Sequence, residues 1–125
     1  MTDVKVVDAS ALAAILFAEP EAATIAAHLR GARLAAPALL WCELANVALN
    51  KCKRHPDQRD QILQAFELRH RLQIEEIAVD HSAILKLALQ TGLTAYDASY
   101  LWLARNLNCD LVTLDKRLSR AFAPG

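Results

Sequence analysis

The sequence has few cysteines, no long apolar run and no net charge, and each absence excludes a class of protein. Its three cysteines form no Cys-x-x-Cys pair and no signal peptide precedes them, so we expect reduced thiols and a cytoplasmic protein. The apolar run at residues 9–18 is shorter than the roughly 20 residues that a membrane span requires, so we expect no membrane association. A formal net charge of zero leaves any nucleic-acid binding to a local basic patch.

What the sequence does contain is a regular alternation of strand and helix signals. The 125 residues are 54% hydrophobic, which predicts one domain over residues 1–125 with a single core. β-branched or alternating segments predict strands at 4–8, 34–36, 74–79 and 109–114. Helical patterns predict helices at 11–18 (capped by Ser10), 20–29, 38–54, from Pro56 to Leu72, from a cap at Asp80 or Ser82 to Gly92, at 94–106 and at 115–122. This order is typical of an α/β fold, a parallel sheet of four strands sandwiched by helices.

Three acidic residues stand at boundaries of the predicted elements. Asp8 and Asp115 lie at or just past the C-terminal ends of strands, and Asp97 lies in the first turn of the helix at 94–106. Because parallel strands end at the same edge of a sheet, Asp8 and Asp115 are expected to lie close together. The positive end of the helix would stabilise the charge of Asp97. Taken singly, each of the three is also explained as an ordinary cap or turn residue.

Glu43 is different, because it lies inside a helical stretch of mostly apolar residues. A carboxylate on an apolar face is costly unless a cation compensates its charge. Asn46 and Asn50 follow at positions i+3 and i+7, so they share one helix stripe with Glu43 and together could line a polar cavity. The alternatives are an exposed edge position or a buried ion pair with an arginine.

Clustered carboxylates repel one another unless they are protonated or neutralised, and a divalent cation resolves the conflict. Because the ligands would be oxygen atoms, and the four histidines form no metal-ligand pattern, a hard ion such as Mg²⁺ or Mn²⁺ is expected in preference to zinc. Such an ion activates a water molecule and offsets charge on a leaving oxygen. The pattern therefore predicts metal-dependent hydrolysis of a phosphodiester.

Four segments containing these acids resemble the four motifs of the PIN-domain ribonucleases, in order and across nearly the whole chain. They are VVDASAL at 6–12, WCELANV at 41–47, TAYDASYL at 94–101 and LVTLDKRL at 111–118. The resemblance implies that Asp8, Glu43, Asp97 and Asp115 surround Mg²⁺, with Asp8 and Asp97 favoured as direct ligands. It also implies a VapC-like toxin: a homodimeric RNA endonuclease, held inactive by a small antitoxin whose C-terminal segment occupies the groove near the acids.

Further residues near the acids are secondary candidates. Ser10 and Thr113 could position a water molecule, although caps and strand-end hydroxyls are the commoner roles. Lys116 and Arg117 directly follow Asp115, where an RNA phosphate would pass, and either phosphate contacts or a solvated surface fits them. Members of this family commonly continue into a further terminal strand beyond the segment at 122–125, so a fifth strand and the dimer packing stay open.

Two other function classes compete with the nuclease. A phosphoaspartyl enzyme would use Asp8 as a nucleophile, but a second aspartate is expected two residues later, where this sequence has Ser10. A PIN-like module that binds RNA or protein without cutting it is the other alternative, and the presence of all four acids argues against it. Neither the RNA target nor the antitoxin follows from any motif, and the aromatic residues Trp41, Phe66, Tyr100 and Trp102 are interpreted as core or dimer-interface residues.

Overall fold

The computed structural model describes residues 3–123 and has a four-stranded parallel sheet at its centre. The strands are β1 (Val4–Val7), β2 (Arg33–Ala36), β3 (Ile74–Glu76) and β4 (Asp110–Val112), in the spatial order β3-β2-β1-β4. Val6, near the end of the central strand β1, pairs with Ala35 of β2 and Leu111 of β4. The predicted α/β fold is confirmed with four strands, and no fifth strand forms within residues 3–123.

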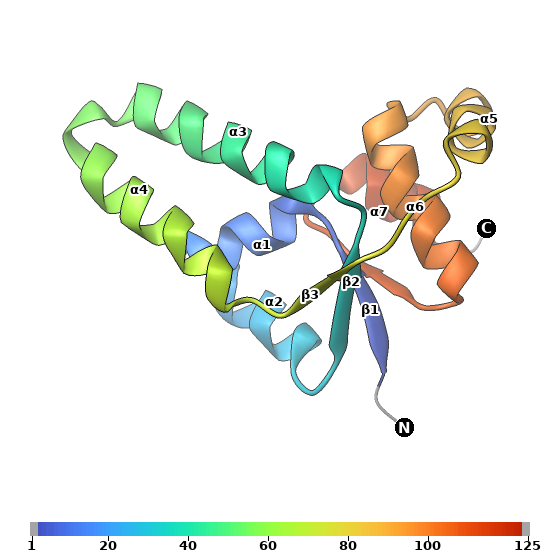
Figure 1. The fold of residues 1–125 in the computed structure, drawn as a ribbon, viewed down its shortest axis with the longest axis horizontal. Coiled ribbons are helices and arrows are strands. Elements are labelled where there is room, and N and C mark those ends of the chain that lie inside the picture. The colour runs from blue at the N-terminus through green and yellow to red at the C-terminus, as the bar shows by residue number, and fades with distance from the viewer. Residues whose placement is uncertain (1–2, 124–125) are drawn as a thin grey trace.

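Helices lie on both sides of this sheet (Figure 1). One group contains α1 (Ala9–Leu16), α2 (Ala22–Leu29), α3 (Leu39–Arg54), the short 3-10 helix η1 (Pro56–Gln58), α4 (Arg59–Glu67) and the 3-10 helix η2 (Leu68–Arg71). The other contains α5 (His81–Thr91), α6 (Ala95–Leu107) and α7 (Lys116–Phe122). Helices α3 and α4 form the expected hairpin, which extends away from the sheet, and α3 packs against α1 at its base.

Small and branched side chains fill the space between the sheet and the helices. Val6 and Ala35 of the two central strands are completely buried, as are Leu12 of α1, Leu44 of α3 and Leu101 of α6. Burying a leucine side chain contributes about 1.5–3 kcal/mol, so these helix positions hold both layers against the sheet. The two central strands end in buried apolar pairs, Val6-Val7 and Ala35-Ala36, as expected where both faces of a sheet are covered, whereas the edge strand β3 is partly exposed.

Several predicted boundaries are wrong by a few residues, with identifiable causes. The cap of α1 is Asp8 and not Ser10, because Asp8 accepts a hydrogen bond from the Ala11 amide at 3.0 Å and so starts the helix two residues earlier. Strands β3 and β4 end at Glu76 and Val112, where pairing with their neighbours stops, and not at 79 and 114. The expected caps of α5 are confirmed: Asp80 accepts from the Ala83 amide, and Gly92 has a left-handed φ of 76°.

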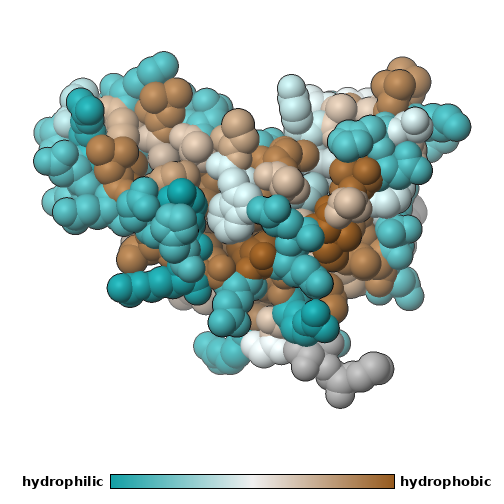
Figure 2. Space-filling view, in the orientation of Figure 1, coloured by the Kyte–Doolittle hydropathy of each residue, from teal (hydrophilic) through white to brown (hydrophobic). Residues whose placement is uncertain are grey.

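The surface combines hydrophilic residues with exposed apolar side chains. Figure 2 shows such apolar side chains over the α3–α4 hairpin, and a hollow between the hairpin and the α5–α7 group. Leu49 and Leu63 on the hairpin and Leu85 and Leu89 on α5 are about half exposed or more. Cys42, Cys52 and Cys109 are free thiols. Within residues 3–123, no helix is both long enough and apolar enough to cross a membrane.

Candidate active site

All four acidic residues identified in the sequence line one cavity of about 560 Å³ at the carboxyl edge of the sheet. Asp8 follows β1, Glu43 lies on α3, Asp97 lies in the first turn of α6 and Asp115 precedes α7. The remaining lining residues are Ala9, Ser10, Leu39, Cys42, Asn46, Val47, Tyr96 and Tyr100, so no lysine, arginine or histidine appears among the described lining. The structure therefore brings together acids that are up to 107 positions apart in the chain.

Asp8 is the most enclosed of the four and is held by several hydrogen bonds. Its side chain is buried, and its Oδ1 atom accepts from the Ser10 hydroxyl at 2.7 Å and from the Ala11 amide at 3.0 Å. Its Oδ2 atom accepts from the Thr113 hydroxyl. This leaves one lone pair on Oδ2. A carboxylate so fully engaged suits a fixed metal ligand better than the free nucleophile that a phosphoaspartyl enzyme needs.

Ser10 and Thr113 connect Asp8 to the loop that carries Asp115. Besides donating to Asp8, the Ser10 hydroxyl accepts from the Leu114 amide at 2.9 Å, and the Thr113 hydroxyl accepts from the Asp115 amide at 2.9 Å. Both hydroxyl protons and one lone pair on each oxygen are thus committed within the protein. These contacts support a role in positioning Asp8 and Asp115 more directly than the alternative role of positioning water.

Helix N-termini surround the cavity. Asp8 caps α1, and Asp115 caps α7 by accepting from the Leu118 amide at 3.0 Å. Thr94 caps α6 by accepting from the Asp97 amide at 3.1 Å, which places Asp97 in the first turn of that helix. The partial positive charge at each helix start stabilises a nearby anion. The capping interpretation is therefore correct for Asp8 and Asp115, and it is compatible with their place in the cavity.

Glu43 is hydrogen-bonded to a tyrosine and is not paired with an arginine, which was one of the alternatives. The Tyr100 hydroxyl donates to Glu43 Oε1 at 2.6 Å, and within residues 3–123 Glu43 makes no ion pair. Tyr100 is 1% exposed, so its ring is in the core, as expected from the sequence. The role of its hydroxyl was missed, although Tyr100 follows Asp97 at i+3 and so shares its helix face.

Burial and mutual repulsion make these carboxyl groups harder to ionise. Burial raises the pKa of Asp8, against the lowering effect of its hydrogen bonds, and the charge of Asp115 raises it further. Burial also raises the pKa of Glu43, which Tyr100 lowers and which the charges of Asp97 and Asp8 raise. The pKa of Asp97 is raised by burial and by Asp115. Each negative charge therefore disfavours the next, and a cation would relieve the conflict.

The donor set fits a hard divalent cation, because all four candidate ligands are carboxylates. Within residues 3–123, however, no three acidic, histidine or cysteine side chains already stand in a metal-binding arrangement. Carboxylates that are not neutralised repel one another. Binding Mg²⁺ would thus require the side chains around the cavity to move closer together.

Lys116 and Arg117 lie beside the cavity and not in its wall. Both are exposed, and the Arg117 guanidinium donates to the Gly92 carbonyl oxygen at 2.9 Å. Burial and Asp115 raise the pKa of Asp97, and the positive charge of Arg117 partly offsets this effect. The predicted phosphate contacts of Lys116 and Arg117 stay predictions.

Comparison with known proteins agrees with the fold and with the four motifs. The family model of the PIN domain matches residues 5–122. The chain is 39% identical to ribonuclease VapC9 of Mycobacterium tuberculosis over 120 residues, covering 91% of this chain and 87% of the relative. It is 32% identical to ribonuclease VapC3 of Pyrobaculum aerophilum over 127 residues, covering 94% and 93%.

A crystal structure of a Pyrobaculum aerophilum protein has a similar fold. It superposes with a TM-score of 0.68 at 24% identity and covers 97% of this chain and 87% of that one. The chain therefore belongs to the PIN domain family, with VapC ribonucleases as its relatives, as its four motifs predict.

Proposed function

We propose that the chain is a metal-dependent endoribonuclease that hydrolyses RNA phosphodiester bonds. The observation that carries the proposal is the cavity in which Asp8, Glu43, Asp97 and Asp115 meet without any basic residue among the described lining. The relatives named ribonucleases support RNA as the substrate. Mg²⁺ is the proposed ion, and Mn²⁺, which also prefers oxygen ligands, is expected to substitute for it.

In this mechanism some side chains of the cavity bind the metal ion and others orient those ligands. Asp8 and Asp97 are the proposed direct ligands, with Glu43 and Asp115 completing the negative charge around the ion. When bound, Mg²⁺ supplies an activated water molecule and offsets charge on the leaving oxygen. Ser10 and Thr113 fix the orientation of Asp8, and Tyr100 fixes that of Glu43. Hydrogen bonds of this kind limit the orientations that a carboxylate can adopt, and so they reduce the rearrangement needed when the ion binds.

The chain is further proposed to act as the toxin of a VapBC-like toxin–antitoxin pair, as a homodimer in the cytoplasm. The names of its relatives support the first part, and its free thiols are compatible with a reducing compartment. Exposed leucines on the α3–α4 hairpin and on α5 provide apolar surface for a second copy and for an antitoxin segment.

The test is RNA cleavage by the purified chain after separation from any antitoxin. We expect cleavage with Mg²⁺ or Mn²⁺ and none with EDTA, and Asp97→Asn should abolish it. Asp80→Asn is the matched control, because Asp80 is an aspartate at a helix start outside the cavity and asparagine preserves its cap. Cleavage that persists in EDTA, or in purified Asp97→Asn, would contradict the proposal.

A further inference from the structure

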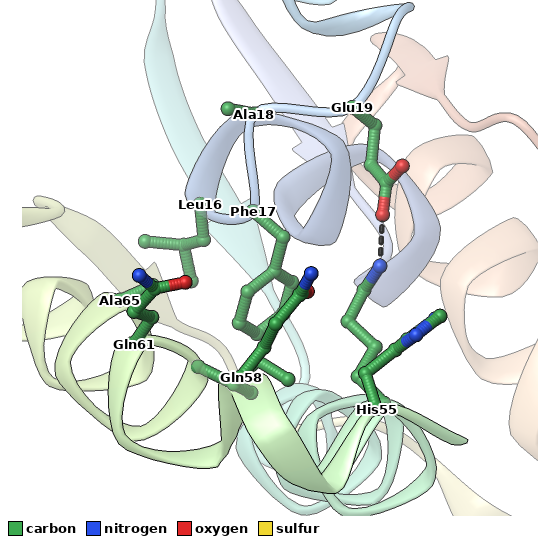
Figure 3. A pocket seen from close by; sticks show the side chains of 10 residues that line it. Leu16, Phe17, Ala18, Glu19, His55, Gln58, Gln61 and Ala65 are labelled. Carbon is green, nitrogen blue, oxygen red and sulfur yellow. Dashed lines mark hydrogen bonds and ion pairs between the residues drawn. The ribbon is translucent and has the colours of Figure 1, made fainter.

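Two more cavities adjoin the acid cavity in series along α3. A cavity of about 280 Å³ shares Ser10 and Val47 with the acid cavity. A third, of about 450 Å³, shares Glu19 and Lys51 with the second and lies between the end of α1 and the start of α4 (Figure 3). Because neighbouring cavities share wall residues, they lie in a row beside α3, and we call this row of cavities the α3 groove.

Polar side chains follow this groove along one stripe of α3. Glu43 and Asn46 line the acid cavity, and Asn50 and Arg54 line the second cavity. Their spacing of three, four and four residues keeps them on one helix face. At 1.5 Å per residue, Glu43 and Arg54 are about 16 Å apart along the helix, a length that several nucleotides would cover. The stripe expected from the sequence at Glu43, Asn46 and Asn50 thus continues to an arginine.

Lys51 and Arg54 both line the α3 groove, but only Lys51 has a negatively charged partner among the described residues. Lys51 is paired with the Glu19 carboxylate, the contact drawn as a dashed line in Figure 3, and its ammonium lies 5.3 Å from the centre of the Phe17 ring. Arg54 is exposed and, within residues 3–123, makes neither an ion pair nor a side-chain hydrogen bond. Arg54 is therefore available to an external anion.

We propose that the α3 groove holds the RNA strand beside the cleavage site and that Arg54 binds one of its backbone phosphates. The inference rests on the proposed ribonuclease function, because RNA supplies the anionic strand that must enter the acid cavity. A phosphate at Arg54 gains a planar guanidinium partner, and the amides of Asn46 and Asn50 offer hydrogen bonds to the strand between them. The contact is to the backbone, so it increases affinity for RNA of any sequence.

The experiment compares Arg54→Ala with Lys53→Ala, two neighbouring substitutions that each remove one positive charge. Both residues lie in the last turn of α3, so each substitution weakens the helix dipole interaction to a similar extent. Lys53, however, lines a separate apolar cavity between α3 and α4. Binding of a fluorescein-labelled single-stranded RNA of random sequence is measured with Mg²⁺ in Asp97→Asn protein, so that the RNA stays intact.

Arg54→Ala should weaken RNA binding by roughly 3- to 10-fold, and should reduce the slope of log K against log salt by about 0.7, the value for one lost phosphate contact on a single strand. In the otherwise wild-type enzyme it should raise KM for RNA by a similar factor. Lys53→Ala should change these quantities much less. Circular dichroism of both variants checks that α3 remains folded.

Equal effects of the two substitutions, or none from either, would overturn the groove proposal, and an antitoxin segment would then be the better occupant. This failure is distinct from failure of the proposed function, because cleavage by wild-type chain is measured separately. If the wild-type chain cleaves RNA with Mg²⁺ but Arg54→Ala weakens RNA binding no more than Lys53→Ala does, only the groove proposal is rejected. Absence of cleavage by the folded wild-type chain in Mg²⁺ rejects the ribonuclease function itself.

Discussion

Replacing Tyr100 by phenylalanine removes one hydroxyl group from beside Glu43 and leaves the aromatic ring in the core. The ring is 1% exposed, and the hydroxyl donates to Glu43 Oε1 at 2.6 Å. A hydrogen bond to a charged partner contributes about 1.5–3 kcal/mol. Glu43 is half-buried, so water can replace part of the lost interaction. We therefore expect Tyr100→Phe to lower the free energy of unfolding by about 1.5 kcal/mol, the lower end of that range.

Urea denaturation in EDTA at neutral pH measures this cost, and a double-mutant cycle with Glu43→Gln assigns it. Against a neutral glutamine the same hydrogen bond contributes about 1 kcal/mol or less, so Tyr100→Phe should be less costly in that background. Tyr96→Phe is the control, because Tyr96 is 64% exposed and its hydroxyl makes no hydrogen bond within the described residues. The same cost for Tyr100→Phe in both backgrounds would refute the assigned interaction.

Three further predictions concern the acids. In EDTA, Asp97→Asn should unfold at a higher temperature than the wild type, because it removes one of the repelling charges. Saturating Mg²⁺ should raise the melting temperature of the wild type more than that of Asp97→Asn. Calorimetry in both buffers measures the two differences. Glu43→Ala should reduce metal-dependent cleavage about 10- to 100-fold while the far-ultraviolet spectrum stays native, and unfolding both with and without Mg²⁺ would instead assign Glu43 a structural role. In the metal-free protein, the raised pKa values of Asp8, Glu43 and Asp97 mean that the native state binds protons more tightly than the unfolded state. Their contribution to stability is complete below about pH 4, the range of the unfolded-state pKa values, and is lost as pH rises through the raised values, so the melting temperature should increase as pH falls from neutral towards 4, and an unchanged or decreasing value would contradict this.

The strand ends and motifs were sufficient to predict which acids meet. Asp8 and Asp115 follow strands that are adjacent and parallel, so the general rule for the edge of such sheets placed them correctly. Glu43 was identified because an acid within an apolar helix needs an explanation, and Asp97 because its segment resembles a known motif. These features depend on local pattern and on the order of the elements, both of which are present in the sequence.

Side-chain contacts between distant segments could not be predicted in the same way. Periodicity places the Tyr100 ring in the core, but its hydroxyl reaches Glu43 only because α6 and α3 adopt a particular rotation across the cavity. Asp8 and Ser10 are both good caps two residues apart, and the choice between them depends on β1. The Asp8 amide donates to the Val112 carbonyl oxygen at 3.3 Å, which continues the strand connection and leaves the Asp8 side chain to start α1.

The surroundings of Arg54 on the surface also could not be predicted from the sequence. In the sequence it belongs to a run of basic residues that resembles any solvated helix end. Only the structure separates it from its neighbours, because Lys51 is paired with Glu19, Lys53 lines a different cavity, and Arg54 lines the cavity that adjoins the acid cavity.

Mass spectrometry of the ends of RNA cut by the wild-type chain in Mg²⁺ tests metal-dependent hydrolysis at the acid cavity most directly. No histidine lines the described cavity to act as an acid–base pair on the 2′-hydroxyl, so activated water is the expected nucleophile. The predicted products carry 5′-phosphate and 3′-hydroxyl ends, and a substrate with one 2′-deoxy residue at the cut site should still be cleaved. A 2′,3′-cyclic phosphate as the primary product, with no cleavage at the deoxy site, would contradict this mechanism even if RNA is the substrate.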